Sequence, residues 1–200
     1  MHIRDASARR TVASQTPTHG SPNEDHRNTG VAIVVSPYQF LQRATSTTRI
    51  THAVSILGDS DRLDWPNFGP VETLRLRFDD IHAPARGWIP PSPEHIAELV
   101  AFGQRWAGSG SIVIHCRAGS SRSPAAAMII AAVLGGAVSD GLVRRVAAAK
   151  TYYRPHRGML ALADRMLNRR PLLSELVQSL SLSAPADPWG PAWIPLAEPT

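Results

Sequence analysis

Short apolar runs recur along the middle of the chain and are separated by segments with helical periodicity. Apolar runs of this length, bounded by turn residues, predict buried strands. The predicted strands cover residues 31–35, 50–57, 71–78 and 111–115. In the run 71–78, apolar Leu74, Leu76 and Phe78 alternate with arginines, so we expect only one face of that strand to be buried.

Helix start signals and apolar stripes lie between these runs. Ser92 is a predicted N-cap and Pro93 the first residue of a helix that extends to about Ala107. A second helix is predicted from Pro124 to Leu134. Further helical patterns cover residues 37–44, 139–150, 157–169 and 172–181. Strands that alternate with helices predict an α/β fold of three layers, with a mainly parallel central sheet flanked by helices.

The two ends of the chain differ in composition from its middle. Residues 1–28 are rich in Ser, Thr, Asn, Arg and Pro and show no periodicity, and residues 183–200 carry several prolines. Such segments bury too little apolar surface to fold alone. The sequence therefore predicts one domain at 29–182, a disordered N-terminal tail at 1–28 and a Pro-rich C-terminal tail at 183–200, which suits a chain of 200 residues.

The most informative segment is residues 115–124, His-Cys-Arg-Ala-Gly-Ser-Ser-Arg-Ser-Pro, between a predicted strand and a predicted helix. A loop at the start of a helix presents unpaired backbone N–H groups and the positive end of the helix dipole, so it favours an anion. Gly119 allows the backbone to bend inward because it has no Cβ. We therefore expect this loop to bind a phosphate group.

Two side chains of this loop suggest chemistry. Cys116 would lie near the helix N-terminus, where a thiol ionises more easily and becomes a nucleophile. Arg122 presents a planar fork of donors that suits two oxygens of a phosphoryl group. The alternative for Cys116 is an inert buried cysteine. The charged and polar residues that follow it favour the nucleophile.

The pattern His-Cys-x-x-Gly-x-Ser-Arg-Ser resembles the signature of the cysteine-dependent protein tyrosine phosphatases, in particular their dual-specificity branch. The resemblance implies that Cys116 forms a cysteinyl-phosphate intermediate while Arg122 and backbone amides hold the phosphate oxygens. It implies that Ser123 assists the departing sulfur, that His115 orients the loop, and that no metal or other cofactor is needed. The amides come from Arg117, Ala118, Gly119, Ser120, Ser121 and Arg122.

This chemistry also needs a general acid, which the family supplies from a loop upstream of the cysteine. Asp79 and Asp80 directly follow the predicted strand 71–78, and Asp80 lies 36 positions before Cys116. Similar Phe-Asp-Asp sequences in the family use the second aspartate, so Asp80 is preferred and Asp79 is the alternative. Either carboxylate would otherwise cap backbone N–H groups at the strand end. His82 is a weaker candidate for the acid.

Charge and cysteine content limit the partners. The net charge is +5, but of 21 basic residues only Lys150 is a lysine and the arginines are scattered, so nucleic acid is not an expected partner. No apolar stretch is long enough to span a bilayer, and membrane insertion is not expected. The remaining histidines show no metal-ligand spacing. No apolar signal-peptide region lies near the amino terminus, so the cytoplasm is the expected compartment. Its reducing conditions would keep the single cysteine, which cannot form an internal disulfide, in its thiol form.

The predicted activity is hydrolysis of phosphotyrosine. The short chain favours a shallow cleft, which would also admit phosphoserine and phosphothreonine. The substrate would be a phosphorylated protein or a small phosphomonoester. Hydrolysis of a phosphoinositide is an alternative, although the loop 115–124 lacks the lysines that would meet extra phosphates. A catalytically inactive module that binds phosphopeptides, and a sulfur-transfer enzyme, are further alternatives, and the presence of Cys116, Arg122 and an upstream aspartate disfavours both.

Overall fold

A computed structural model of the chain describes residues 30–150, 152–168, 170, 172–178 and 190–197. The predicted N-terminal tail, residues 1–28, lies outside these described residues. The same is true of 183–189 and 198–200 in the predicted C-terminal tail.

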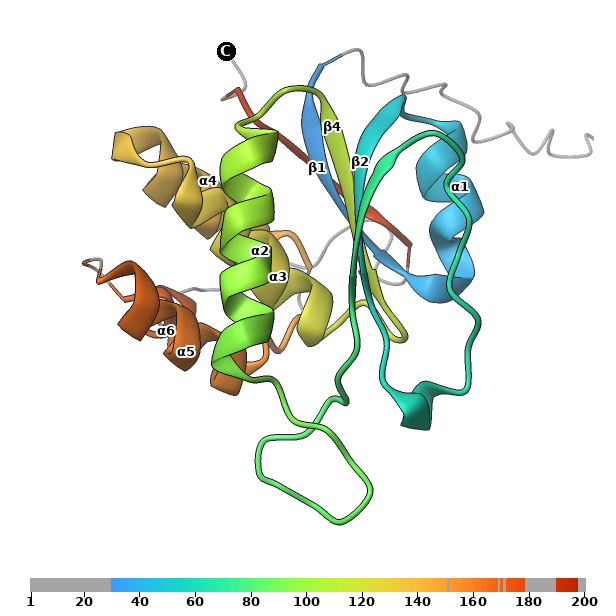
Figure 1. Cartoon of the computed structure of the whole chain (residues 1–200). Helices are drawn as coiled ribbons and strands as arrows, with labels where there is room; N and C mark the ends of the chain where they lie inside the picture. The colour runs from blue at the N-terminus through green and yellow to red at the C-terminus, as the bar shows by residue number, and fades with distance from the viewer. Residues whose placement is uncertain (1–29, 151, 169, 171, 179–189, 198–200) are drawn as a thin grey trace, which may run out of the picture.

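A five-stranded sheet forms the centre of the protein, with the strand order β3-β2-β4-β1-β5 (Figure 1). The strands are β1 (Ala32–Pro37), β2 (Ile50–Ile56), β3 (Glu72–Leu76), β4 (Ser111–Cys116) and β5 (Ala192–Pro195). The first four are parallel, and β5 pairs antiparallel with β1. Parallel strands all end at the same edge of a sheet. Residues 115–124, which carry the sequence signature, therefore start at the edge where β1, β2 and β3 also end.

Helices cover both faces of this sheet. The α-helices are α1 (Leu41–Ser46), α2 (Pro93–Trp106), α3 (Arg122–Val133), α4 (Gly136–Ala148), α5 (Arg157–Leu167) and α6 (Leu173–Gln178), and 3-10 turns cover η1 (Tyr38–Phe40) and η2 (Asp59–Asp61). Figure 1 shows α1 on one face and the other five helices on the opposite face. This arrangement confirms the predicted α/β fold with three layers and a mainly parallel sheet.

The unequal helix layers produce a large core and a small one. Successive side chains of a strand point to opposite faces of the sheet. Ile33 and Ile112 therefore pack in the large core under α2–α6, whereas Val34 and Val113 pack in the small core under α1. The central helix α3 is buried on all sides, and its residues from Pro124 to Ala131 are small or apolar. A helix that is apolar all round belongs inside the protein. Helix α3 therefore gives residues 115–121, which directly precede it, a rigid support.

Strand β5 falls within the segment 183–200 that the sequence places in a C-terminal tail. Residues 192–195 instead extend the sheet beside β1, with Ile194 opposite Ile33 and Trp193 opposite Val34. The indole N–H of Trp193 donates to the Thr48 hydroxyl at 3.1 Å. A four-residue strand between prolines gives too short an alternation to be recognised, and its pairing with β1 is a long-range contact.

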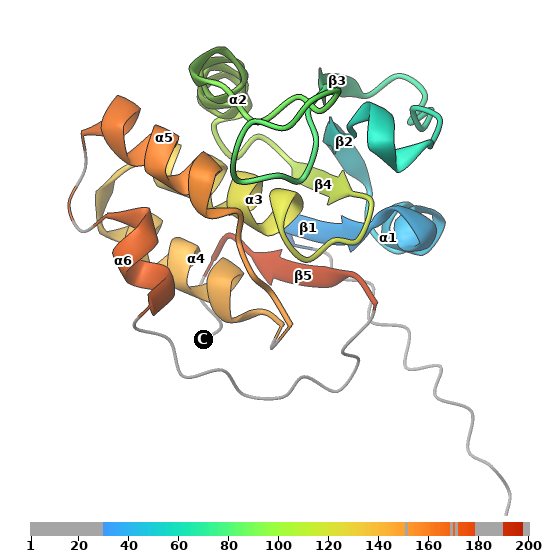
Figure 2. The same ribbon diagram turned by 90° about the horizontal axis from the view of Figure 1, so that it is seen from below.

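A loop between β3 and α2 projects from the edge of the sheet where the parallel strands end (Figure 1). Its tip is a turn in which Ala85 bridges Trp88, and the side chains of Trp88 and Ile89 are 46% and 43% exposed. Seen from below, the base of this loop lies over the start of α3 (Figure 2). The loop carries Asp79 and Asp80, which places both beside the signature segment.

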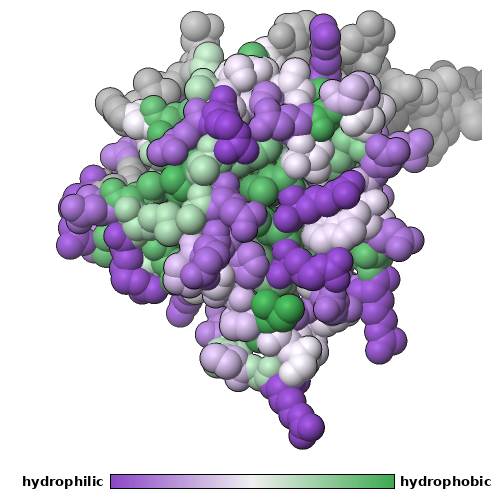
Figure 3. All heavy atoms as spheres, in the orientation of Figure 1, coloured by the Kyte–Doolittle hydropathy of each residue, from purple (hydrophilic) through white to green (hydrophobic). Residues whose placement is uncertain are grey.

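Hydrophilic side chains cover most of the face shown in Figure 3. Within the described part of the chain, no helix has both the length and the apolar character required to cross a bilayer.

Candidate active site

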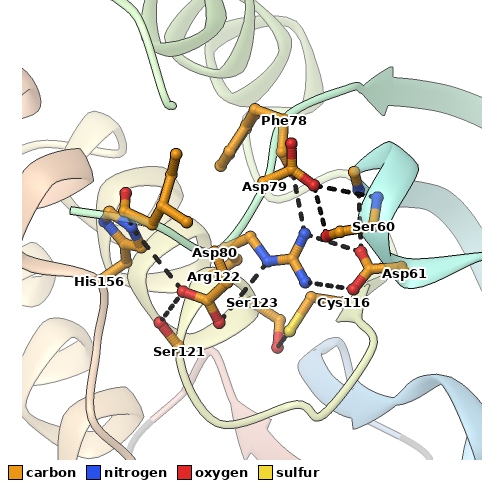
Figure 4. Close-up of polar contacts among 12 residues, drawn as sticks. Ser60, Asp61, Phe78, Asp79, Asp80, Cys116, Ser121, Arg122, Ser123 and His156 are labelled. Atoms are coloured by element: carbon orange, nitrogen blue, oxygen red, sulfur yellow. Dashed lines mark hydrogen bonds and ion pairs between the residues drawn. The ribbon is translucent and has the colours of Figure 1, made fainter. Parts of the chain in front are cut away.

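The sulfur of Cys116 lies at the base of a loop that joins β4 to α3. We call residues 115–123 the signature loop. Cys116 is fully buried at the end of β4, and its Sγ accepts a hydrogen bond from the Gly119 amide at 3.3 Å. The Ser123 hydroxyl lies 3.3 Å from the same sulfur (Figure 4). An amide and a hydroxyl that both approach the sulfur stabilise negative charge on it.

Glycine is required at position 119 because the loop passes close to β1. Gly119 has a φ of +70°, and a Cβ there would lie 2.6 Å from the backbone nitrogen of Pro37. The neighbouring peptides are braced from outside: Tyr38 N–H donates to the Arg117 carbonyl at 3.1 Å, and Arg154 N–H donates to the Ser120 carbonyl at 2.8 Å. These two bonds brace the turned shape of the loop.

The Arg122 guanidinium is buried and held by the loop that follows β2. It forms a two-pronged ion pair with Asp61, in which Nη1 and Nη2 lie 2.9 and 3.0 Å from the two carboxylate oxygens, and Nη1 also donates to the Phe78 carbonyl at 2.9 Å. Both side chains of the pair are nearly inaccessible to solvent, at 2% and 5% exposure. Two parallel hydrogen bonds fix the plane of the guanidinium as well as its position.

The charge of Arg122 is maintained despite its burial. Burial by itself lowers the pKa of this group, but the hydrogen bonds and negative charge of Asp61, with further contributions from Cys116 and Asp80, raise it above its ordinary value. Among the described residues, the Nε of Arg122 has no hydrogen-bond acceptor although it is buried. A buried N–H without an acceptor is costly, so this atom is suited to an oxygen of a bound anion.

Asp80 lies at the open side of this group of residues, with its side chain 35% exposed. One carboxylate oxygen accepts a hydrogen bond from the Ser121 hydroxyl at 2.7 Å and lies 3.8 Å from His156 Nε2. The other lies 3.8 Å from Arg122 Nε. The structure thus brings Asp80 next to the signature loop, facing the same space as the guanidinium (Figure 4).

The side chain of Asp79 points away from the sulfur, and its oxygens are already bonded to residues outside the signature loop. Its carboxylate accepts hydrogen bonds from the amide and hydroxyl of Ser60 and from the Ile89 amide. Burial raises the pKa of Asp79, but these hydrogen bonds outweigh that effect and the net pKa is lowered. Gly58 leaves room for it, since a Cβ there would lie 2.1 Å from an Asp79 oxygen. Asp79 therefore ties the two ends of its own loop to η2.

His115 precedes the nucleophile candidate and lies entirely inside the protein. Its Nε2 lies 2.7 Å from the Ser55 hydroxyl on β2, and the rings of Tyr38 and Phe68 contact it at centroid distances of 5.8 and 6.0 Å. Burial lowers the pKa of His115 to about 4. The ring is therefore neutral at pH 7, and it supports the signature loop from behind rather than from the solvent side.

His156 joins the two loops of the site, a position that the sequence analysis did not assign to it. Its backbone N–H donates to the Ser121 carbonyl at 3.1 Å. Its ring accepts the Met159 amide at Nδ1, so Nε2 carries the proton and donates to the Ile81 carbonyl at 2.9 Å. Burial lowers the pKa of His156, which preserves this neutral form. The side chain of His82 stacks on this ring at 4.4 Å.

The remaining predicted residues of the loop are Arg117, Ala118 and Ser120. Arg117 and Ala118 are exposed, and Ser120 serves through its carbonyl. Asp61 and His156 contact the candidate site residues, and the sequence analysis did not include either of them. Asp61 follows a strand and a glycine, as residues at the ligand-binding edge of a parallel sheet do, and this was the available signal. Among the described residues, no group of three or more His, Cys, Asp and Glu side chains is arranged to hold a metal ion.

Comparisons with known proteins agree with the architecture. No family model matches the sequence, and no curated protein matches it. The structure is similar to that of human DUSP28, with a TM-score of 0.52 and 16% identity over 74% of this chain and 95% of that one. Two others are DUSP15 (TM-score 0.47, 18% identity, 76% and 94% covered) and Tk-PTP in its active form (0.47, 18%, 80% and 100%). The chain has the fold of the dual-specificity cysteine phosphatases.

Proposed function

We propose that the protein is a cysteine-dependent phosphatase that hydrolyses phosphotyrosine, and also phosphoserine or phosphothreonine, in proteins. The observation that supports this most directly is the convergence of three groups on one space. The Cys116 sulfur lies in a hydrogen-bonded turn, the Arg122 guanidinium has a buried N–H without an acceptor, and the Asp80 carboxylate lies 3.8 Å from that N–H. A nucleophile, an oxyanion site and an acid are the parts that phosphomonoester hydrolysis needs.

In the first step, the Cys116 thiolate attacks the phosphorus atom and a sulfur–phosphorus bond forms. The bond between phosphorus and the ester oxygen breaks, and Asp80 in its protonated form gives its proton to that oxygen. The Arg122 guanidinium and the amides of the signature loop hold the phosphoryl oxygens as charge moves onto them. The exposed position of Asp80 leaves room for the departing alcohol.

In the second step, a water molecule attacks the phosphorus of the cysteinyl-phosphate. Asp80, now a carboxylate, takes a proton from that water, and inorganic phosphate leaves as the sulfur–phosphorus bond breaks. The Ser123 hydroxyl lies 3.3 Å from Sγ and donates a hydrogen bond to the thiolate that forms. Atoms and charges balance without any cofactor. His115 keeps the loop in place because its ring is bonded to Ser55 on the neighbouring strand.

A small phosphomonoester or a phosphoinositide is the alternative substrate. Lysines within the signature loop would meet the extra phosphates of such a ligand. The loop contains Arg117 and Arg122 but no lysine. This favours a phosphoprotein over a phosphoinositide.

The activity is tested with p-nitrophenyl phosphate and a phosphotyrosine peptide, without added metal. We expect release of inorganic phosphate, inhibition by vanadate, and loss of turnover in Cys116→Ser. Rapid denaturation during turnover and mass spectrometry are expected to detect phosphate on Cys116. Phosphopeptide binding without any turnover would instead support the inactive binding module. Sulfur transfer from thiosulfate without phosphate release would contradict the phosphatase altogether.

A further inference from the structure

A cavity adjoins the candidate active site. It has a volume of about 360 Å³ and lies between the segment before α5, the helices α5 and α6, and His82. This size falls at the lower end of the range typical of ligand pockets, roughly 300–1,000 Å³. Nothing in the proposed mechanism uses it. Figure 2 shows α5 and α6 side by side, with the segment that leads into α5 passing close to the signature loop.

The cavity has an apolar floor and a basic rim. Tyr153 and Leu160, which are 3% and 1% exposed, and Val177 supply apolar surface inside it. His82, Arg154 and Arg157 line it as well, and all three are exposed to solvent. Of the described residues that line the cavity, none is acidic. A ligand that fits therefore combines an apolar group with a negative charge.

Short contacts connect this cavity to the catalytic groups. His82 stacks on His156 at 4.4 Å, and His156 Nε2 lies 3.8 Å from the Asp80 carboxylate. On the other side, the Arg154 amide bonds the Ser120 carbonyl in the signature loop. The departing group of a substrate leaves on the side of Asp80. We therefore expect part of the chain that carries that group to lie beside the cavity.

We propose that this cavity is a specificity subsite for a phosphoprotein segment in which an acidic residue neighbours an apolar one, close to the phosphorylated residue. The apolar side chain covers Leu160 and Val177, and the carboxylate meets Arg157 at the rim. The inference rests on the proposed function, because it assumes that a phosphorylated side chain occupies the space above Cys116.

The test measures peptide binding to the Cys116→Ser protein by fluorescence anisotropy. Two labelled phosphotyrosine peptides are compared, one with Glu-Leu pairs on both sides of the phosphotyrosine and one with Gln-Ser pairs in the same places. We expect the Glu-Leu peptide to bind about tenfold more tightly, because a charge-assisted bond and an apolar contact are added. Equal affinities would overturn the subsite.

Two variants and one control locate the effect. Arg157→Gln removes the rim charge, and Ala161→Tyr fills the cavity from an exposed position on α5. Each is expected to reduce the tenfold preference to less than threefold. Arg105→Gln is the matched control, since Arg105 is exposed and pairs with Glu72 at the start of β3, at the opposite edge of the sheet. If the control removes the preference as strongly as Arg157→Gln, general charge attraction explains it and the proposal is wrong.

A lipid headgroup is a different outcome and is tested separately. Phosphatidylcholine vesicles with and without a phosphatidylinositol phosphate are added to the same proteins. If Arg157→Gln weakens only vesicle binding and leaves both peptides unaffected, a lipid surface occupies the cavity and the peptide subsite is overturned. Hydrolysis of p-nitrophenyl phosphate by the unsubstituted protein tests the proposed function on its own. Failure of that assay with retained Glu-Leu preference would reject the catalyst and keep the subsite.

Discussion

The signature loop and the wall opposite it are built in different ways. Residues 115–123 are contiguous, and one turn of backbone places the sulfur, the amides and the guanidinium together. The opposite wall combines residues 58–61, 78–81 and 153–156, which meet only when the sheet and α5 have formed. The loop provides the sulfur, the amides and the guanidinium, whereas the wall provides Asp80 and the carboxylate of Asp61 that holds Arg122 in place. The difference separates chemistry that is local in sequence from positioning that depends on the whole fold.

The first prediction concerns the two neighbouring aspartates of the wall. Asp80→Asn removes the proton donor, so we expect kcat to fall about 10²- to 10⁴-fold on phosphotyrosine peptide or phenyl phosphate. On p-nitrophenyl phosphate the loss is expected to be much smaller, since its leaving group needs little protonation. Asp79→Asn is the matched control, because Asp79 bonds Ser60 and Ile89 rather than facing the sulfur. We expect Asp79→Asn to lower the melting temperature but to leave the ratio of the rates on the two substrates close to that of the unsubstituted protein. Equal losses of Asp80→Asn on both substrates would remove Asp80 from the acid role.

The second prediction concerns the partner of Arg122. Asp61→Ala leaves a buried cation without its carboxylate and removes the acceptor of the Gly58 amide. Breaking one side of a buried ion pair costs about 3–5 kcal/mol, which urea unfolding would measure. Asp59→Ala is the control, since Asp59 lies in the same 3-10 turn and pairs with Arg77 at the surface. An exposed pair contributes no more than about 1 kcal/mol. Similar losses in both variants would show that Asp61 acts only through the turn.

These two predictions indicate what the sequence could and could not reveal. The strands, the helix start at Ser92 and Pro93, and the roles expected of Cys116 and Arg122 depend on short-range patterns or fixed offsets. The pairing of Asp61 with Arg122 joins residues 61 positions apart. Strand β5 likewise depends on pairing with the other end of the chain. The local pattern does not identify such a contact, because an aspartate after a strand and a glycine has the same sequence whether it caps a turn or holds an arginine.

The third prediction uses the buried histidine behind the loop. Since burial lowers the pKa of His115 from 6.5 to about 4, the unfolded chain takes up a proton at a higher pH than the folded one. The contribution of His115 to the free energy of unfolding is therefore at its maximum above pH 6.5. It decreases as the pH falls toward 4, by roughly 3 kcal/mol in total. Unfolding free energies measured at several pH values should show this slope.

His115→Gln separates this contribution from the carboxylates that also titrate in acid. The variant lacks an ionisable group at the position, so its stability is expected to decrease less steeply between pH 6.5 and 4 than that of the unsubstituted protein. His156, whose pKa is also lowered by burial, adds to the slope in both proteins and cancels in the difference. Parallel curves for the two proteins would show that His115 does not titrate as its burial requires.

The last and smallest predicted effect belongs to His156, which connects the signature loop to the wall. His156→Ala removes the side-chain cap of α5 and the bond to the Ile81 carbonyl, and loss of a cap costs about 1 kcal/mol. Because the backbone bond to Ser121 remains, we expect the signature loop to keep its shape and Asp80 to lose its orientation. The kcat for poor leaving groups should then fall severalfold, while KM and the rate with p-nitrophenyl phosphate change little. His156→Asn retains a capping oxygen, and we expect it to restore stability without restoring that kcat, since its shorter side chain does not reach Ile81. If Asn restores both, His156 acts only as a helix cap and the positioning of Asp80 depends on Ser121 and Arg122 alone.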